Sequence, residues 1–273
     1  MGYLVTMLIL LALLYVWMLR CRRNHPHWEK LQGVRFAHRG YHDKPQIPEN
    51  SMAAFRRARE RGWGVELDVH LTRDGALAVI HDASLLRTAG ADVYIEDLTV
   101  EELKQYRLEG TQEQIPLLEE VLELFAGGPP MVVELKAERG NHDRLAEAAC
   151  RVLDRYPGIY AVESFDPRCI RWLYRNRPEI LRGQLSAEYL KNPEGIRLPR
   201  PLMFALQNLL SNCLTCPDFI AYRVEDRRKL SLWLCRKLYG VREFNWTVTE
   251  KEKLLEMERL GNHVIFERFD PEE

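Results

Sequence analysis

The architecture and chemistry of this chain are decided by residues 36–82, which read FAHRGYHDKPQIPENSMAAFRRARERGWGVELDVHLTRDGALAVIHD. Three short strand-like runs in this stretch end in, or carry, reactive side chains: His38-Arg39-Gly40, Glu66-Leu67-Asp68 and His81-Asp82. Side chains two residues apart on a strand point to the same side, so Glu66 and Asp68 are expected to share one face. Between the first two runs, Asn50-Ser51 is a good N-cap pair for a helix over residues 52–61.

The third run follows the second after a short turn, Thr72-Arg73-Asp74-Gly75. A parallel crossover needs about a dozen residues. The two runs are therefore predicted to form a β-hairpin, which brings His81 near Glu66. Residues 84–116 are then an excursion whose short helix is opened by a capping box of Thr99 and Glu102.

The rest of the chain alternates apolar strand-like runs with helical patterns. Strands are predicted at residues 33–38, 65–69, 131–135, 159–164, 181–185, 218–222, 242–246 and 264–266, with helices between the later ones at 142–156, 167–176, 226–239 and 249–260. Eight βα-type units in about 250 residues are typical of a (β/α)8 TIM barrel. A doubly wound open sheet is the alternative, but no Gly-x-Gly-x-x-Gly fingerprint follows any strand.

Chemically active residues fall at or near the carboxyl ends of the predicted strands. In barrels that rim is where active sites form. The residues are His38, Glu66, Asp68, Glu134, Lys136, Ser164 and Trp246.

Glu66, Asp68 and Glu134 are predicted to form an all-oxygen site for one hard divalent cation, Ca²⁺ or Mg²⁺. The alternative, solvated carboxylates, fits poorly for Glu66 and Glu134, because each lies within an apolar run where an unpaired charge is costly. His38 and His81 are expected on either side of a bound phosphate as general acid and base, in an order that the sequence leaves open. Together these are the parts of a metal-assisted phosphodiester-cleaving site.

Several other residues near the predicted site can be interpreted in two ways. Arg39 and Lys136 could neutralise phosphate charge or pair with the metal-site carboxylates. Trp246 could stack on substrate or pack in the barrel core. Glu49 and Asn50 are predicted supporting residues, although an N-cap role alone would explain Asn50. His42, His70, His142 and His263 lack comparable neighbours in the sequence and are predicted to be structural.

The composition limits the possible partners. The 273 residues hold 39 basic and 40 acidic side chains, which argues against a nucleic-acid partner. The six cysteines show no spacing typical of a small secreted domain, so reduced thiols are expected. Cys213-x-x-Cys216 lacks a second Cys or His pair at zinc-site spacing and is predicted to be incidental.

The first segment, residues 1–24, predicts a membrane anchor. Tyr3 to Leu19 is an apolar run followed by Arg20, Arg22 and Arg23, and a span needs about 17–25 such residues. A cleaved signal peptide would have positive charge before the run and small residues at its end. An uncleaved single-pass helix in the cell membrane is therefore expected. The arginines place the catalytic domain, residues 33–273, in the cytoplasm beyond a short linker over residues 25–32.

A second apolar segment, residues 201–210, is hydrophobic almost all round. A helix of this kind is either buried or lies on an apolar surface. An interfacial helix on a lipid bilayer and an internal or oligomer contact are both open.

Beyond residue 33 the chain resembles the glycerophosphodiester phosphodiesterases. The matching motifs occur in the family's order: His38-Arg39-Gly40, Pro48-Glu49-Asn50-Ser51, Glu66-Leu67-Asp68, Asp74-Gly75, His81-Asp82, Glu134-Leu135-Lys136, Ser164-Phe165 and Trp246-Thr247-Val248. The resemblance implies a (β/α)8 barrel with a small insertion at about residues 84–116. It also implies one divalent cation, Ca²⁺ or Mg²⁺, and hydrolysis of glycerophosphodiesters to glycerol 3-phosphate and an alcohol.

The last predicted strand departs from the family pattern. The family usually has a Gly-Ile-x-Thr-Asp-x-Pro-like run there, whereas this chain has residues 264–271, VIFERFDP, so the roles of Glu267 and Asp270 stay open. Two rival functions also remain: a lysophospholipase D that takes lysophospholipids from a lipid bilayer, and a non-catalytic lipid-sensing barrel. The presence of both histidines and all three carboxylates speaks against the second. No protein partner is implied.

Overall fold

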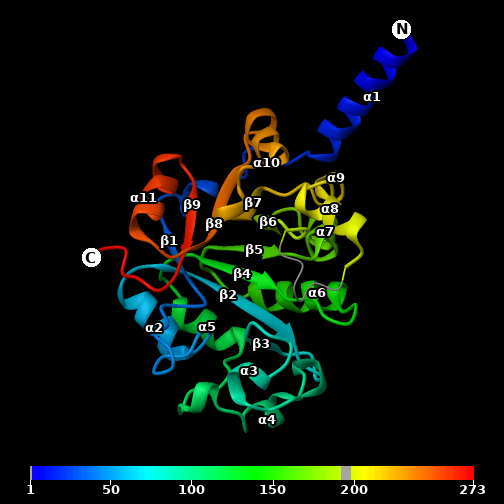
Figure 1. The fold of residues 1–273 in the computed structure, drawn as a ribbon. Coiled ribbons are helices and arrows are strands. Elements are labelled where there is room, and N and C mark those ends of the chain that lie inside the picture. Colours follow the sequence, from blue (N-terminus) through cyan, green and yellow to red (C-terminus); the bar gives the residue numbers. More distant parts are fainter. Residues whose placement is uncertain (1, 192–197) are drawn as a thin grey trace.

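The computed structural model describes residues 2–191 and 198–273; Met1 and residues 192–197, which fall within the predicted anchor and barrel, lie outside the described part. A nine-stranded sheet has the order β1-β9-β8-β7-β6-β5-β4-β2-β3, and a further pairing of β1 with β2 closes it. All strands except β3 run parallel to their neighbours. The predicted (β/α)8 TIM barrel is confirmed (Figure 1).

The barrel strands lie close to the predicted positions because most of them are short, largely apolar runs that the barrel buries on both faces. Strand β2, for example, is buried at every one of its eight positions. The bounds are β1 Arg35–His38, β2 Gly64–Leu71, β4 Met131–Leu135, β5 Tyr160–Ser164, β6 Arg182–Ser186, β7 Phe219–Arg223, β8 Arg242–Val248 and β9 His263–Phe266.

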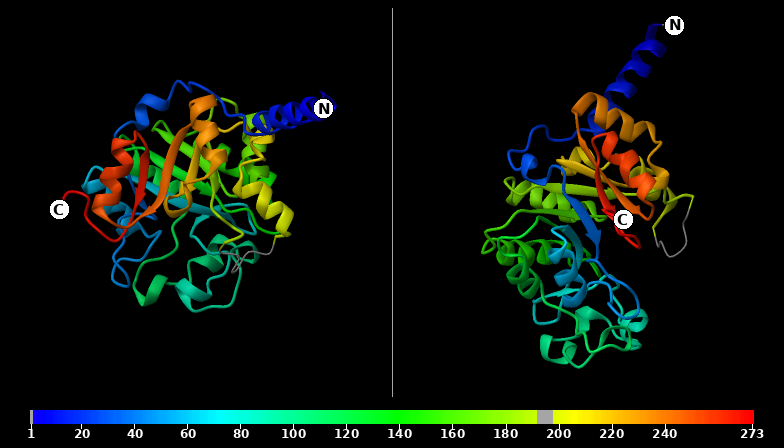
Figure 2. Two further views of the ribbon diagram at one scale, coloured as in Figure 1. Left: turned by 45° about the horizontal axis from the view of Figure 1, so that its top comes forward. Right: turned by 90° about the vertical axis from the view of Figure 1, so that its left-hand side faces the viewer.

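Helices cover the outside of the barrel (Figures 1 and 2). They are α2 Met52–Glu60, α5 Leu118–Phe125, α6 His142–Leu153, α7 Pro167–Asn176, α8 Arg200–Gln207, α9 Asn212–Thr215, α10 Leu230–Leu234 continuing as the π-helix η5 Cys235–Tyr239, and α11 Lys251–Arg259. Ser51 caps α2 by accepting from the Ala54 amide, as its hydroxyl and position predict.

The predicted hairpin is also confirmed. Strand β3 (Leu77–Val79) pairs antiparallel with β2, with Val69 opposite Val79. The chain then leaves the barrel as a small lobe, seen at the bottom of Figure 1. It contains α3 (Leu86–Ala89), η2 (Ile95–Asp97), α4 (Val100–Leu103) with the predicted capping box, and η3 (Leu108–Gly110). Its core is built from Leu85, Ile95, Leu103 and neighbouring residues.

Residues 25–32, expected to be a linker, carry a short 3₁₀ helix, η1 (Trp28–Leu31), whose Trp28 and Leu31 are buried. The Trp28 ring contacts Phe219, Phe244 and His263, which line the amino-terminal end of the barrel. This segment therefore closes the barrel opposite the rim where the reactive residues were predicted.

Helix α1 (Gly2–Met18) forms within the predicted apolar run and projects from the barrel with its side chains exposed (Figures 1 and 2). It has 17 residues, the lower limit of the about 17–25 that a membrane span needs. Across residues 2–191 and 198–273, no helix combines the length and apolar character needed to cross a membrane. The predicted transmembrane helix is therefore not supported.

The apolar segment 201–210 forms most of α8. Met203 and Leu206 are buried beside Tyr189, whereas Leu202 and Phe204 are exposed. The helix thus has one packed side and one free apolar side, so it fits neither expectation completely.

Candidate active site

Three carboxylates meet on the paired strands β2 and β4. The parallel register places Asp68 opposite Glu134, and Glu66 opposite His38 of β1. Glu66, Asp68 and Glu134 are all buried and each offers an oxygen that lies within 4.8 Å of the others. The predicted trio is therefore brought together by strand pairing.

These residues fit a hard divalent cation. Burial and the neighbouring carboxylates of Asp68 and Glu134 raise the pKa of Glu66 well above its usual value. Burial likewise raises the pKa of Glu134 to about 7, against the lowering effect of Lys136. Buried carboxylates that repel one another and offer only oxygen ligands are the kind of site that hard divalent cations prefer.

Two positively charged side chains already contact these three carboxylates. Lys136 Nζ lies 3.1 Å from Asp68 Oδ1 and 2.9 Å from Glu134 Oε1, and Arg39 Nε lies 3.4 Å from Asp68 Oδ2. Burial opposes the charge on Asp68, but Lys136 holds its pKa well below the usual range. Arg39 and Lys136 were predicted either to bind phosphate or to pair with these carboxylates. In the structure they pair with the carboxylates, at the edge of the cation site.

His38 is held by a carboxylate from the last strand. Its Nδ1 lies 2.7 Å from Glu267 Oε2, and its Nε2 lies 3.9 Å from Glu66 Oε2. His42 Nε2 lies 3.6 Å from the same Glu267 oxygen, so the expectation that His42 lacks such neighbours is wrong. The turn that carries His38 needs Gly40, because its φ is +80° and an added Cβ would lie 2.9 Å from the Ala54 Cβ.

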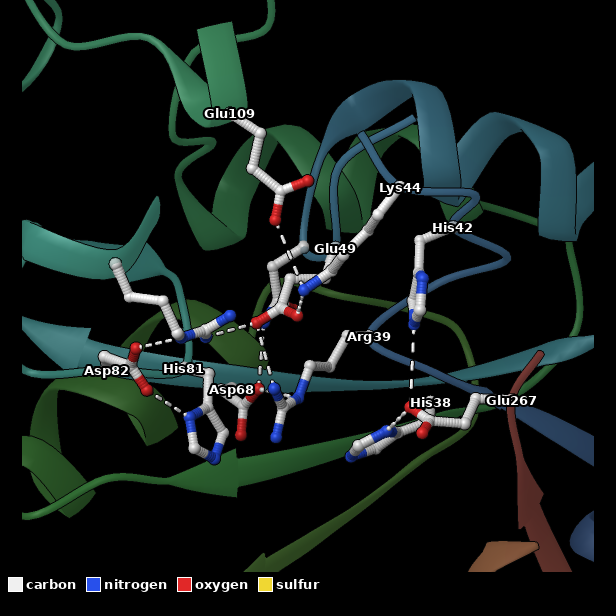
Figure 3. A network of polar contacts seen from close by, with 12 residues as sticks. His38, Arg39, His42, Lys44, Glu49, Asp68, His81, Asp82, Glu109 and Glu267 are labelled. Carbon is white, nitrogen blue, oxygen red and sulfur yellow. Dashed lines mark hydrogen bonds and ion pairs between the residues drawn. The ribbon is translucent and has the colours of Figure 1, made fainter. Parts of the chain in front are cut away.

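His81 is held in a similar way. Its Nδ1 lies 2.6 Å from Asp82 Oδ1, and Arg87 from the insertion donates to Asp82 Oδ2. Figure 3 shows His38 and His81 on opposite sides of Asp68 and Arg39. Burial lowers the pKa of both histidines, so each ring is neutral near pH 7 before a ligand arrives.

Glu49 joins the two halves of the site. Arg39 Nη1 lies 2.9 Å and Arg87 Nη2 2.6 Å from Glu49 Oε1, while Lys44 donates to the other oxygen (Figure 3). Burial raises the pKa of Glu49, but the bonds from Arg87 and Lys44 and the charge of Arg39 lower it to about 2. Glu49 therefore stays ionised and affects the site through the three basic side chains that it contacts.

Asn50 has a role beyond the expected helix cap, which Ser51 takes. Its Nδ2 donates to Asp68 Oδ2 over 2.8 Å, and its backbone amide donates to the Arg39 carbonyl. Asn50 thereby orients both a cation ligand and the turn that carries His38.

Aromatic side chains border the polar groups next to Lys136, whose Nζ lies 5.8 Å from the centre of the Phe165 ring. Phe165 and Trp246 pack edge to face with ring centroids 5.4 Å apart, and the Trp246 Nε1 is buried without a hydrogen-bond partner. A cavity of about 370 Å³ opens between His81, Lys136 and Phe165. It offers room for a substrate beside the carboxylate trio.

Sequence reasoning located the two histidines and three carboxylates but missed the groups that hold them. Glu267 was left open, and His42, Lys44, Asp82 and Arg87 were given no role. Two of these groups had a positional signal in the sequence: Asp82 follows His81, and Glu267 directly follows the last strand. Their partners come from other elements and are invisible in a linear pattern.

Two carboxylate-held histidines beside an acidic cation site, on the carboxyl rim of a TIM barrel, define a phosphodiesterase of the hydrolase class. Residues 38–267 match the glycerophosphoryl diester phosphodiesterase family. The chain belongs to this family and is an enzyme that hydrolyses phosphoric diesters.

Individual relatives agree with the family assignment. A glycerophosphodiester phosphodiesterase of Caldanaerobacter subterraneus subsp. tengcongensis is 32% identical over 235 residues, covering 82% of this chain and 89% of the relative. A human lysophospholipase D is 34% identical over 168 residues, covering 57% of this chain and 50% of that protein. The fold matches an Oleispira antarctica phosphodiesterase in complex with its product sn-glycerol-3-phosphate, with a TM-score of 0.70, 24% identity and coverage of 88% and 94%.

Proposed function

We propose that this chain hydrolyses glycerophosphodiesters to glycerol 3-phosphate and an alcohol, using one divalent cation, Ca²⁺ or Mg²⁺. The observation that carries the proposal is the placement of His38 and His81 on opposite sides of Asp68 (Figure 3), which forms a buried cluster with Glu66 and Glu134. The glycerophosphodiester phosphodiesterase from Caldanaerobacter and the glycerol 3-phosphate complex of the Oleispira protein support the substrate class.

The chain's own residues divide the work. One neutral histidine takes a proton from the attacking hydroxyl, and the other, once protonated, gives a proton to the leaving alkoxide. The attacker is water, or it is the 2-hydroxyl of the substrate's own glycerol, in which case a cyclic phosphate forms and water then opens it to glycerol 3-phosphate. Glu267 and Asp82 each hold one imidazole by its Nδ1, leaving the Nε2 for the substrate. A cation held by the three carboxylates supplies charge neutralisation for the phosphate oxygens.

Arg39 and Lys136 complete the electrostatics. Both are held against Asp68, and Lys136 has its pKa raised, against burial, by Asp68 and Glu134. Fixed positive charges next to the cation site stabilise the negative charge that grows on a phosphoryl group during the reaction. Trp246 would close the substrate pocket on the side of Phe165.

We also propose that the protein works at a cell membrane, with α1 seated in the lipid and the barrel on the cytoplasmic side. The support is chemical. Exposed leucines surround α1, including Leu10 and Leu13, each 60% exposed. Three arginines follow the helix, at positions 20, 22 and 23.

A second candidate is a lysophospholipase D, which would take a single-chain lipid from that membrane. The free apolar side of α8, with Leu202 and Phe204 exposed, favours it, as does the likeness to the human lysophospholipase D. The two candidates share one site and differ in the alcohol half of the substrate.

The test is turnover by the full-length chain in a mild detergent. The substrates are glycerophosphocholine, glycerophosphoethanolamine, glycerophosphoglycerol and a lysophosphatidylcholine, each with Ca²⁺, Mg²⁺ or chelator. Full length is needed because Leu19 and Arg22 belong to the folded body: Leu19 is buried, and Arg22 Nη2 lies 2.8 Å from Asp218 Oδ2.

Cation-dependent turnover that His81→Ala abolishes is the expected result. A preference for the lysolipid over all water-soluble diesters would establish the second candidate. A folded protein without turnover on any substrate or cation would refute both and favour a non-catalytic lipid-sensing barrel.

A further inference from the structure

A row of exposed apolar and basic side chains runs along α10 and η5. Residues 227–241 contain five basic and no acidic residues. Leu230, Trp233 and Leu238 are 64%, 55% and 40% exposed, and Arg228 and Lys237 of the same segment are exposed as well. We call Arg228, Leu230, Trp233, Lys237 and Leu238 the α10 patch.

The opposite side of the same helix explains why the patch points outward. Leu232 and Cys235 are fully buried and pack against Leu19, Ile220 and Tyr222. A helix with one buried apolar side normally shows polar residues on its other side. Here the outer side combines large apolar side chains with positive charge, a pattern typical of helices that lie at a lipid interface.

The charges of the patch are free, in contrast to those of its neighbours. Arg227 and Arg236 pair with the buried Glu243, and Lys229 pairs with Glu188. Arg228 and Lys237 have no acidic partner among the described residues. Their positive charge is therefore available to anionic groups outside the protein.

The patch is continuous with the base of α1. Tyr239 Oη donates to the Val16 carbonyl over 2.7 Å, and Arg23 donates to the Leu238 carbonyl. At the end of α1, the Arg20 guanidinium lies 5.4 Å from the centre of the Trp17 ring. Figure 1 shows α10 at the end of the molecule from which α1 projects. The α10 patch and Trp17, which Arg20 accompanies, thus belong to the same end of the protein.

We propose that the α10 patch docks on an anionic lipid surface, with Leu230, Trp233 and Leu238 at the acyl boundary and Arg228 and Lys237 among the lipid phosphates. This inference rests on the proposed membrane function and extends it. Tryptophan prefers the interface, and each lysine or arginine near an anionic bilayer strengthens binding. Docking by two elements would hold the barrel in one orientation, whereas α1 alone would leave it free to turn.

Tryptophan quenching tests the patch separately from α1. In a full-length Trp17→Phe protein, five tryptophans remain; Trp28 and Trp63 are buried, Trp172 and Trp246 are half-buried, and Trp233 is exposed. The protein is mixed with vesicles carrying brominated acyl chains. These are made of phosphatidylcholine alone or of equal parts phosphatidylcholine and phosphatidylglycerol.

Quenching on the anionic vesicles is expected, and a further Trp233→Phe change should abolish most of it. Arg228→Glu with Lys237→Glu should weaken the quenching and remove its dependence on phosphatidylglycerol. The matched control is Lys104→Glu with Arg144→Glu, two exposed positions on the insertion and α6, which should leave it unchanged. Equal quenching with and without Trp233, or no effect of the paired charge reversal, would overturn the proposal.

Turnover of a water-soluble glycerophosphodiester separates this inference from the proposed function. No patch residue lies in the active site, so all variants should keep that turnover. Normal turnover without Trp233 quenching refutes the docking surface alone. Absent turnover in the unaltered protein refutes the proposed function, whatever the quenching shows.

Discussion

Glu267 Oε2 on β9 lies 2.7 Å from Nδ1 of His38 on β1. This contact exists because the last strand pairs with the first when the barrel closes, with Ala37 opposite Phe266. Asp82 holds His81 by the same ring nitrogen. The two histidines are therefore positioned by equivalent carboxylates from different parts of the chain.

Replacement of Glu267 should disturb His38 without unfolding the barrel. Glu267→Ala removes the acceptor that fixes the ring, and we expect kcat to fall by roughly 10–100-fold, as for other outer partners of site histidines. Burial lowers the pKa of His38 and Glu267 raises it, so the limb of the pH–rate profile due to His38 should move to lower pH. Glu267→Gln, which keeps an acceptor, should lose less; an unmoved limb in Glu267→Ala would exclude this role.

Arg87 should act as a positioning residue through Asp82 and Glu49, both of which it contacts. We expect Arg87→Met to lower kcat by roughly tenfold or more with little change in KM, because the imidazole of His81 loses its fixed orientation. Steady-state kinetics with a water-soluble diester measure this. Arg73→Met is the matched control, since Arg73 pairs with the exposed Glu102. Equal losses in both variants would contradict the assignment.

Cation binding should be visible in stability as well as in turnover. Without a cation, burial and neighbouring carboxylates raise the pKa of Glu66, so its charge opposes folding. Glu66→Gln should therefore raise the melting temperature measured in chelator. It should also abolish the further increase that Ca²⁺ or Mg²⁺ gives the unaltered protein. A cation-induced shift that survives Glu66→Gln would place the ion elsewhere.

His263 should make the barrel sensitive to acid. Burial, together with the charge of Arg242, lowers its pKa to about 4. From about pH 6.5 down to about pH 4 the unfolded chain binds a proton that the folded chain does not, so the free energy of unfolding falls as pH falls. The loss approaches roughly 3 kcal/mol.

His263→Phe keeps a ring next to Phe244 but removes the titrating group. Urea unfolding at about pH 7.5 and about pH 5 should therefore show a smaller acid loss in this variant than in the unaltered protein. The same loss in both would exclude His263 as a source of the acid sensitivity.

Trp28 should be essential for stability although it precedes the first barrel strand. Its ring centroid lies 6.1 Å from that of Phe219 and 5.9 Å from that of Phe244. Removing a buried tryptophan costs about 3–5 kcal/mol, so Trp28→Ala should shift the urea midpoint strongly while Lys30→Ala, exposed on the same turn, should not. A midpoint unchanged in Trp28→Ala would mean that residues 25–32 are a free linker.

Much of the fold was predictable because it follows from local patterns. Apolar runs separated by amphipathic helices placed Met131–Leu135 and Pro167–Asn176 at their observed bounds. The short link after Asp74-Gly75 required a hairpin. No helix in the described part of the chain supports the predicted membrane span. Helix α1 ends at Met18, ahead of Leu19, which is buried among side chains from β7 and α10.

By itself, the sequence indicated the barrel, the histidine pair and the three carboxylates. Glu66, Asp68 and Glu134 lie on strands, whose period of two fixes the direction of their side chains. Only the tertiary structure decided which groups hold them. Glu267 reaches His38 across 229 residues, and Arg87 reaches Glu49 across 38. Such contacts depend on barrel closure and on the packing of the insertion, and no local pattern in the chain encodes either distance.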